Sequence, residues 1–187
     1  MSLRIRIKKM LTRPLPGMIA GREVIIERPH RISRPEFIRI GDRTHIHRNA
    51  MIAPICEYAG VRFVPRIEIG SDCYIGPNLY LACIHRITIG DGSVLSEDVY
   101  INDSNHGLDP DAGLIMNQPL SHGGDVSIGK SCFLGLRSAI MPGVTLGDHC
   151  IVGIGSVVTT SFPAYSMVGG APARLRKRYD PDRKDWV

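Results

Sequence analysis

A six-residue repeat runs through most of this chain and constrains its fold more than any other feature. An Ile, Leu or Val opens each unit, and in eleven of fifteen units the next residue is Gly, Ala or Ser. The fifteen aliphatic positions are Ile40, Ile46, Ile52, Ile69, Ile75, Leu81, Ile89, Leu95, Ile101, Ile128, Leu134, Ile140, Leu146, Val152 and Val158. One unit is a short strand and a turn, and three units close a triangular coil. The repeat therefore predicts an all-β prism of stacked coils about 4.8 Å apart.

The repeat is interrupted at three places, where loops are expected to leave the coils. Residues 58–68 form an insertion, Ile87 and Thr88 form a two-residue slip, and residues 104–125 form a long excursion loop. Upstream, Ile26, Ile32 and Ile38 keep the spacing and predict a starter coil. Residues 171–180 follow the repeat and read as a short basic helix that begins after Pro172. We therefore expect a basic arm at 1–25, the repeats at 26–163, and a C-terminal segment with that helix at 164–187.

Composition restricts the function classes. The 187 residues suffice for one domain, and no apolar run approaches the length of a membrane span or signal peptide. The charge is +8 over residues 1–48, −6 over 49–173 and +3 over 174–187. Basic residues interleaved with aromatics are absent, so nucleic acid is not an expected partner. The arm at residues 4–13 could rest on an anionic membrane as a peripheral contact or cap the end of the prism; both readings stay open.

The cysteines and most histidines read as structural. Cys56, Cys73, Cys132 and Cys150 fall at the inward small position of the repeat, and Cys83 lies outside it. An odd number of cysteines without a CxxC motif indicates a reducing cytoplasm. Zinc sites between β-prisms, as in gamma-class carbonic anhydrases, use a histidine pair five residues apart, which this sequence lacks, so no metal is expected. His85 at an inward position and His149 at a turn are expected to be structural.

His106 is the exception among the histidines. It follows Ile101 in the last unit before the excursion loop, so its imidazole should lie at a corner beside a groove that the loop can cover. Position alone does not separate a catalytic imidazole from an ordinary loop histidine.

At this point the chain resembles the hexapeptide-repeat acyltransferases, in the branch of maltose, galactoside, nodulation-factor, streptogramin and polysaccharide O-acetyltransferases. The resemblance is carried by Asn105-His106, Gly123-Gly124-Asp125, SIGKSCFLG at 127–135, IMPGVTLG at 140–147, GIGSVVT at 153–159 and VGGAPAR at 168–174. It implies a left-handed parallel β-helix of about five to six coils, an acetyl-CoA donor, and a homotrimer with active sites in the grooves between subunits. It also implies that His106 is the general base.

The resemblance also assigns binding residues. The positions that it places against CoA are Gly135, Leu136, Gly153, Ile154, Thr159, Thr160, Arg174 and Lys177. The glycines would leave room for the pantetheine arm, and the two cations would meet the nucleotide phosphates. The expected contacts to a saccharide acceptor are Tyr74, Asn78, Asp103 and Asn105, although Gly76 stands where the galactoside branch has a helpful Asn. The basic arm and the Glu57-Tyr58 insertion resemble the enzymes of surface-polysaccharide biosynthesis, which favours a sugar on a lipid carrier or nucleotide.

Three functions remain open from the sequence. The first is an acetyl-CoA-dependent saccharide O-acetyltransferase in the cytoplasm. The second is acetylation of an antibiotic or an amino sugar, which would use the same His106 corner. The third is a non-catalytic β-helical scaffold, which would neither bind CoA nor need His106. Sugar nucleotidyl transfer is disfavoured because no Gly-rich nucleotide-binding domain precedes the repeats.

Overall fold

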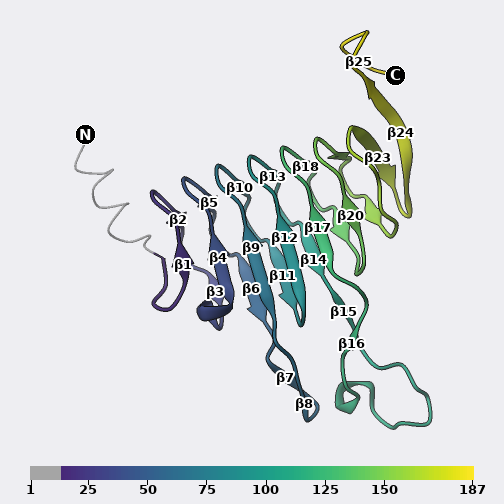
Figure 1. The fold of residues 1–187 in the computed structure, drawn as a ribbon. Coiled ribbons are helices and arrows are strands. Elements are labelled where there is room, and N and C mark those ends of the chain that lie inside the picture. The colour runs from purple at the N-terminus through teal and green to yellow at the C-terminus, as the bar shows by residue number, and fades with distance from the viewer. Residues whose placement is uncertain (1–13) are drawn as a thin grey trace.

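The structure, a computed structural model, describes residues 14–187, and the main body of the chain is a three-sided prism of parallel sheets (Figure 1). The first sheet consists of β1 (Ile19–Ala20), β4 (Ile38–Ile40), β9 (Arg66–Ile69), β12 (Arg86–Ile89), β17 (Val126–Ile128) and β20 (Thr145–Leu146). The second contains β2 (Ile25–Ile26), β5 (His45–Ile46), β10 (Tyr74–Ile75), β13 (Val94–Leu95), β18 (Phe133–Leu134), β21 (Ile151–Val152) and β23 (Ser166–Gly170). The third consists of β3 (Arg31–Ile32), β6 (Met51–Pro54), β11 (Tyr80–Cys83), β14 (Tyr100–Asn102), β19 (Ala139–Ile140) and β22 (Val157–Val158).

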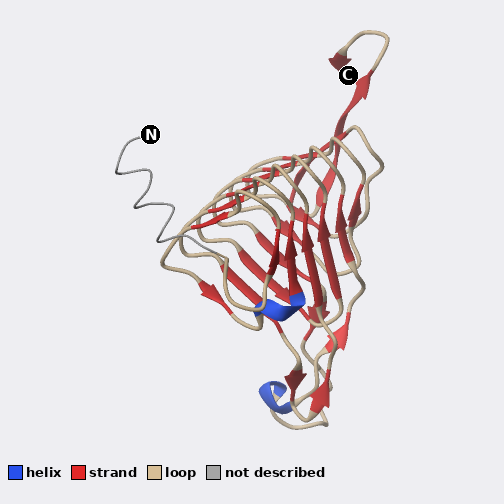
Figure 2. Ribbon diagram, turned by 60° about the vertical axis from the view of Figure 1, so that its left-hand side comes forward, coloured by secondary structure: helices blue, strands red, loops and turns tan. Residues whose placement is uncertain are grey.

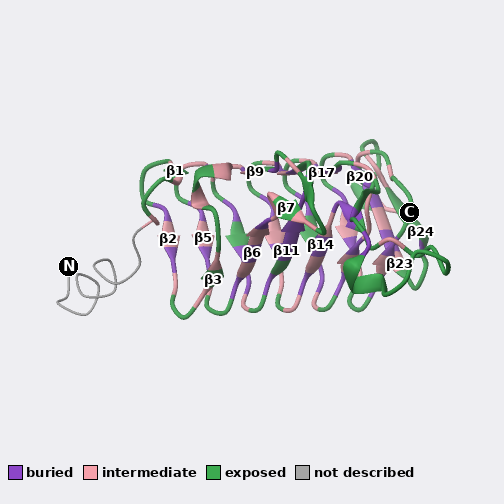
Figure 3. Cartoon of the chain, turned by 90° about the horizontal axis from the view of Figure 1, so that it is seen from below, coloured by how far each residue is buried: buried purple, intermediate pink, exposed green. Residues whose placement is uncertain are grey.

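The chain visits the three sheets in turn, which gives six complete coils in the described part and confirms the predicted left-handed β-helix. Strands and loops make up the prism, and within residues 14–187 the helical elements are the short turns η1 (Pro35–Phe37) and η2 (Ile115–Asn117) (Figure 2). The repeat positions stack in register, so that Ile69 pairs with Ile40 on one side and with Ile89 on the other. These aliphatic side chains fill the interior, and buried residues alternate with more exposed ones along the strands (Figure 3).

The glycine after the aliphatic residue serves close packing between coils. A Cβ on Gly70 would lie 2.5 Å from Asp91 Oδ1 and 2.6 Å from Asp91 N. The left-handed backbone conformation falls two residues later, at Asp72, with φ 57°. At this corner, Gly70 leaves room for the next coil, and the polar residue Asp72 takes the left-handed conformation that completes the turn.

The inward small position also makes hydrogen bonds between coils. At the corners between the first and second sheets, each small side chain donates to the carbonyl of the next coil. Thr44 Oγ1 donates to Gly70 O at 2.7 Å, and Cys73 Sγ donates to Gly90 O at 3.3 Å. Cys73, Cys132 and Cys150 are buried, as predicted, whereas Cys56 is half-buried because it begins the insertion.

The C-terminal segment corrects the sequence analysis. Residues 171–180 were expected to form a short basic helix, but Ala173–Asp180 is the strand β24, which pairs antiparallel with β23 and then with β25 (Asp185–Trp186). Residues 173–180 form a strand because β23 would otherwise leave an unpaired edge of the second sheet. Long-range backbone pairing with β23 outweighs the local helix propensity of this segment. This hairpin projects from the end of the prism (Figure 1).

The N-terminal boundary also differs from the expected one. The first coil begins at Ile19, which pairs with Arg39, so residues 19–25 belong to the prism and not to an arm. The basic stretch at 4–13, including its two alternative roles, lies outside the described residues.

Candidate active site

Two excursions leave the prism from the same end of the third sheet. The hairpin of β7 (Glu57–Tyr58) and β8 (Val61–Arg62) follows β6, and the excursion loop of residues 104–125 follows β14. The base of the excursion loop is closed by antiparallel pairing between β15 (Ser104–Asn105) and β16 (Ser121–His122). Both excursions extend below the prism in Figure 1, and the Tyr58 hydroxyl donates a hydrogen bond to Met116 O at 3.0 Å. This hydrogen bond joins the hairpin to the excursion loop beside the third sheet.

A pocket of about 270 Å³ lies between these excursions and the third sheet. Its lining includes Tyr58, Tyr80, Tyr100, Asn102, Asn105 and His106. The His106 side chain is exposed, and within residues 14–187 neither of its ring nitrogens has a hydrogen-bond partner. The Tyr58 ring contacts the imidazole edge-on, with centroids 5.6 Å apart and planes at 74°. His106 thus combines an exposed imidazole, whose nitrogens have no hydrogen-bond partner in the described chain, with an aromatic neighbour in edge-on contact.

Asp103 fixes the point at which the excursion loop leaves the prism. Its carboxylate is fully buried and accepts the backbone N–H groups of Ile84, His85 and Arg86 at 2.8, 2.8 and 2.9 Å. The Cys83 thiol donates to it at 3.3 Å. Because no solvent reaches this carboxylate, its predicted role as an acceptor contact is wrong. Asp103 instead anchors the corner two residues before Asn105, which lines the pocket.

The excursion loop is folded on itself by Gln118. This buried side chain accepts the Asp109 N–H at 3.0 Å and donates to Asp109 O at 2.8 Å and Gly113 O at 3.1 Å. The loop is therefore an ordered wall of the pocket and not only a connection.

Tyr80 and Tyr100 form an aromatic surface in the pocket that sequence reasoning missed. They are directly paired residues on β11 and β14, and their rings stack with centroids 5.0 Å apart and planes at 9°. Burial raises the pKa of the Tyr100 phenol, which therefore stays neutral at physiological pH. The available signal was their outward position on neighbouring coils, one residue before the inward Leu81 and Ile101.

The residues expected to face CoA are distributed over three parts of the structure. Gly135 and Leu136 precede β19, and Gly153 and Ile154 precede β22, so all four lie at the opposite end of the third sheet from His106. Thr159 and Thr160 follow β22, at the same end as His106 but two coils further along. A Cβ added to Gly135 would lie 2.8 Å from Ile154 N, which is too close. A Cβ added to Gly153 would have its nearest contact, Val168 O, at 3.4 Å.

Arg174 and Lys177 lie on β24, and their side chains are exposed. Lys177 Nζ donates to Trp186 O at 3.1 Å, and Arg174 Nη1 donates to Ala173 O at 3.0 Å. Tyr74 is on the second sheet, where its ring contacts His47, and Asn78 is at the next corner, between Asn49 and Asp98. Within one chain, neither Tyr74 nor Asn78 lines the His106 pocket.

His85 also departs from its expected place. Its side chain is 60% exposed and not inward, because Ile84 fills the interior at the corner where the repeat slips. Two clusters in the described part bring together side chains that can bind a metal: Glu27 with His45 and His47, and His85 with His122 and Asp125. Neither cluster includes His106.

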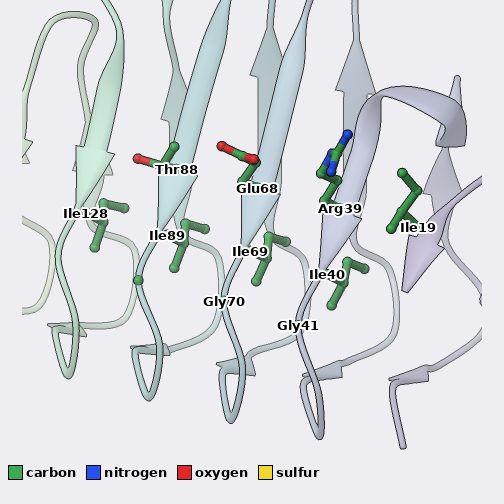
Figure 4. A pocket seen from close by; sticks show the side chains of 11 residues that line it. Ile19, Arg39, Ile40, Gly41, Glu68, Ile69, Gly70, Thr88, Ile89 and Ile128 are labelled. Carbon is green, nitrogen blue, oxygen red and sulfur yellow. The ribbon is translucent and has the colours of Figure 1, made fainter. Parts of the chain in front are cut away.

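A larger, shallow hollow of about 390 Å³ lies on the first sheet, where Arg39, Glu68 and Thr88 lie on successive coils (Figure 4). Its one carboxylate, Glu68, is bound by Arg66 at 2.6 Å and Arg86 at 3.0 Å. The Arg66 hydrogen bond lowers the pKa of Glu68 and keeps it ionised. The described residues that line this hollow include no group that could exchange protons near neutral pH, so we assign the candidate active site to the His106 pocket.

Comparison with known proteins places the chain among acyltransferases of this architecture. The family model described as the hexapeptide repeat of succinyl-transferase matches residues 66–103 and 125–160. The chain is 31% identical over 126 residues to WbbJ of Escherichia coli K12, which is named as a lipopolysaccharide biosynthesis O-acetyl transferase; the match covers 64% of each chain, just under two thirds of WbbJ. It is 30% identical to WcaF of the same organism, named as a colanic acid biosynthesis acetyltransferase, over 73% of this chain and 71% of WcaF.

Among solved structures, AntD, an N-acyltransferase from Bacillus cereus in complex with dTDP and 3-hydroxybutyryl-CoA, has a TM-score of 0.73. It is 21% identical and aligns over 97% of this chain and 91% of its own. At this identity the likeness supports the fold alone. Within the described residues, no helix is long and apolar enough to cross a membrane.

Proposed function

This chain belongs to the hexapeptide-repeat acyltransferase family, and on that premise we propose that it is an acetyl-CoA-dependent O-acetyltransferase acting on a saccharide in surface-polysaccharide biosynthesis. The observation that carries the proposal is His106: an exposed imidazole in a pocket with aromatic and amide walls, on a loop anchored by a buried carboxylate.

In the proposed reaction, His106 acts as general base. A sugar hydroxyl does not ionise at neutral pH, so the imidazole accepts its proton as the oxygen attacks the thioester carbonyl of acetyl-CoA. The tetrahedral oxyanion then collapses and expels the CoA thiolate, which takes the proton back from the imidazolium. The products are the acetyl ester and free CoA, with no covalent acyl-enzyme. A backbone N–H is the donor expected to stabilise the oxyanion.

The lining of the pocket suits a sugar ring. The stacked pair Tyr80 and Tyr100 offers an aromatic face for the C–H groups of a pyranose, and Asn102 and Asn105 offer amides for its hydroxyls. The names of WbbJ and WcaF favour a saccharide in polysaccharide assembly over an antibiotic or an amino sugar. That the saccharide is carried on a lipid or nucleotide is the expectation from the sequence resemblance.

A homotrimer is part of the proposal, because one chain separates groups that the reaction needs together. Tyr74 and Leu136 lie away from the His106 pocket of the same chain. If the second sheet of one subunit faces the His106 pocket of the next, the donor and acceptor contacts meet between subunits. The side chains of Tyr74 and Phe133 on the second sheet are 41% and 44% exposed, and such an interface would cover them. The five free thiols fit the cytoplasm, where we place the enzyme.

The primary test separates catalysis from donor binding. Acetyl-CoA binding is measured by calorimetry, and transfer is measured as thiol release with carrier-linked saccharides. We expect His106→Ala to bind acetyl-CoA as the wild type does and to lose about 10²–10⁴-fold in turnover. His149→Asn is the matched control, since His149 is an exposed histidine at a turn with φ 58° that Asn also tolerates. Absence of acetyl-CoA binding by the folded wild type would refute the transferase and favour the scaffold.

A glycine pair tests the donor site. Gly153→Ala has room in the chain, with its nearest contact at 3.4 Å, so a loss of acetyl-CoA affinity without a loss of melting temperature would place the ligand at that corner. Gly135→Ala meets backbone at 2.8 Å and should lower the melting temperature as well. Unchanged acetyl-CoA affinity in Gly153→Ala would remove this corner from the donor site.

A further inference from the structure

Three side chains from separate segments converge at the base of the excursion loop. His85 Nδ1 lies 2.6 Å from Asp125 Oδ1, and His122 Nε2 lies 2.9 Å from the same oxygen. The centroids of the two imidazole rings are 4.5 Å apart, and the three possible ligand atoms all lie within 4.8 Å of one another. The side chain of His85 is 60% exposed, that of His122 is 41% exposed and that of Asp125 is 44% exposed, so a solvated ion can reach them.

The backbone behind this cluster is held from two sides. The buried Asp103 carboxylate accepts the N–H of His85, and the Asp103 carbonyl accepts the N–H of Gly123 at 3.0 Å. His122 is in addition paired with Ser104 across the β15–β16 ladder. The cluster is therefore built on the prism and on the closed base of the loop, not on the loop's free end.

The donor set suits one class of ion. Two neutral imidazole nitrogens and one carboxylate oxygen are typical ligands of zinc, nickel or cobalt, which bind nitrogen at about 2.0–2.1 Å and oxygen at about 2.0–2.2 Å. In a tetrahedral site such ligands lie about 3.3–3.5 Å apart. The side chains would move outward by less than about 1 Å to admit the ion, and the open face would leave a position for water.

We propose that His85, His122 and Asp125 form a binding site for a divalent transition metal of the zinc type. The ion links the corner between β11 and β12 to β16 and to the residue before β17, and so clamps the base of the loop that carries His106. Its role is structural, because His106 is not among its ligands. The sequence-based expectation of no metal considered histidines five residues apart, whereas His85 and His122 are brought together by the coil and the returning loop.

The test is titration of the untagged protein, freed of metal by chelation, with ZnCl₂ in a calorimeter at neutral pH. Co²⁺ serves as a second probe, because its visible absorption reports nitrogen and oxygen ligands. We expect one Zn²⁺ per chain at this cluster, a rise in melting temperature, and at least about tenfold weaker binding in His122→Gln and in Asp125→Asn. Binding should also weaken at about pH 5.5, where protons compete for the imidazoles.

Two further variants separate the alternatives. His149→Asn removes an exposed histidine outside the cluster and should bind Zn²⁺ as the wild type does. His47→Gln disrupts the other histidine cluster and should leave this site intact. The proposal is overturned if the folded wild type binds neither ion, or if His122→Gln and Asp125→Asn, shown to be folded by circular dichroism, bind as tightly as the wild type. Loss of the site in His47→Gln alone would assign the metal to Glu27, His45 and His47 and would also overturn it.

Discussion

Replacement of Asp103 by Asn should destabilise the protein through the corner that carries the active-site loop. In the native chain, Oδ1 accepts the Ile84 N–H, and Oδ2 accepts the N–H groups of His85 and Arg86. An Asn side chain has one acceptor oxygen. If that oxygen takes the place of Oδ2, the amide NH₂ faces the Ile84 N–H, and one hydrogen bond is lost in a fully buried place.

The magnitude follows from the kind of bond. A hydrogen bond to a charged group contributes about 1.5–3 kcal/mol, and a neutral one contributes about 1 kcal/mol. One lost bond and two weakened ones should lower the free energy of unfolding by about 2–4 kcal/mol. Asp103→Ala, which leaves three backbone donors without a partner, should cost more. The assay is urea unfolding followed by far-UV circular dichroism at one fixed protein concentration.

The matched control is Asp111→Asn, an exposed carboxylate on the same loop, which should change the free energy of unfolding by less than about 0.5 kcal/mol. The reasoning is refuted if Asp103→Asn unfolds like the wild type and only raises the KM for the saccharide. That result would restore Asp103 as an acceptor contact and would mean that the carboxylate is accessible.

Three further outcomes are expected. Gly70→Ala should lower the free energy of unfolding by about 1–3 kcal/mol, because its Cβ would lie 2.6 Å from the Asp91 backbone nitrogen. A urea midpoint like that of the wild type would show that the backbone at this corner moves to admit the Cβ. The pKa of Glu68 is lowered by its hydrogen bond from Arg66, so its stabilisation is present above its ordinary value of 4.5 and is lost as the pH falls below it; Glu68→Gln should flatten the decline in stability between about pH 5 and about pH 3. Burial and the Asp103 charge raise the pKa of Cys83, so iodoacetamide at about pH 8 should label the half-buried Cys56 well before Cys83, as peptide mass spectrometry would detect.

The prism was predictable from the sequence because its constraint is local and repeated. Ile40, Ile69 and Ile89 occupy equivalent places on successive coils, and each unit carries its own inward aliphatic residue and, as a rule, its own small residue. The excursion loop and His106 could be found for the same reason, since a regular repeat makes its interruptions visible. The resemblance added the role of His106, which periodicity alone did not supply.

The sequence-based predictions failed where contacts between segments distant in sequence determine the local structure. The basic segment after Pro172 has no repeat to guide it, and its strand forms because β23 leaves an edge to pair with. Asp103 looked like an acceptor contact because it stands next to the site in sequence, but three N–H groups from the preceding corner enclose it. Tyr58 and Met116 are 58 residues apart, and nothing in either segment predicts their hydrogen bond.

The sequence by itself determined the coil, its aliphatic interior, its turns and the places where loops leave it, because these depend on residues within one hexapeptide and its immediate neighbours. Only the tertiary structure decided what the loops do once they leave. It placed the Tyr58 ring against the His106 imidazole and brought His85 to His122 and Asp125. The physical reason is that stacking places residues about one coil apart in sequence at about 4.8 Å, whereas the loops close through single contacts that no period encodes.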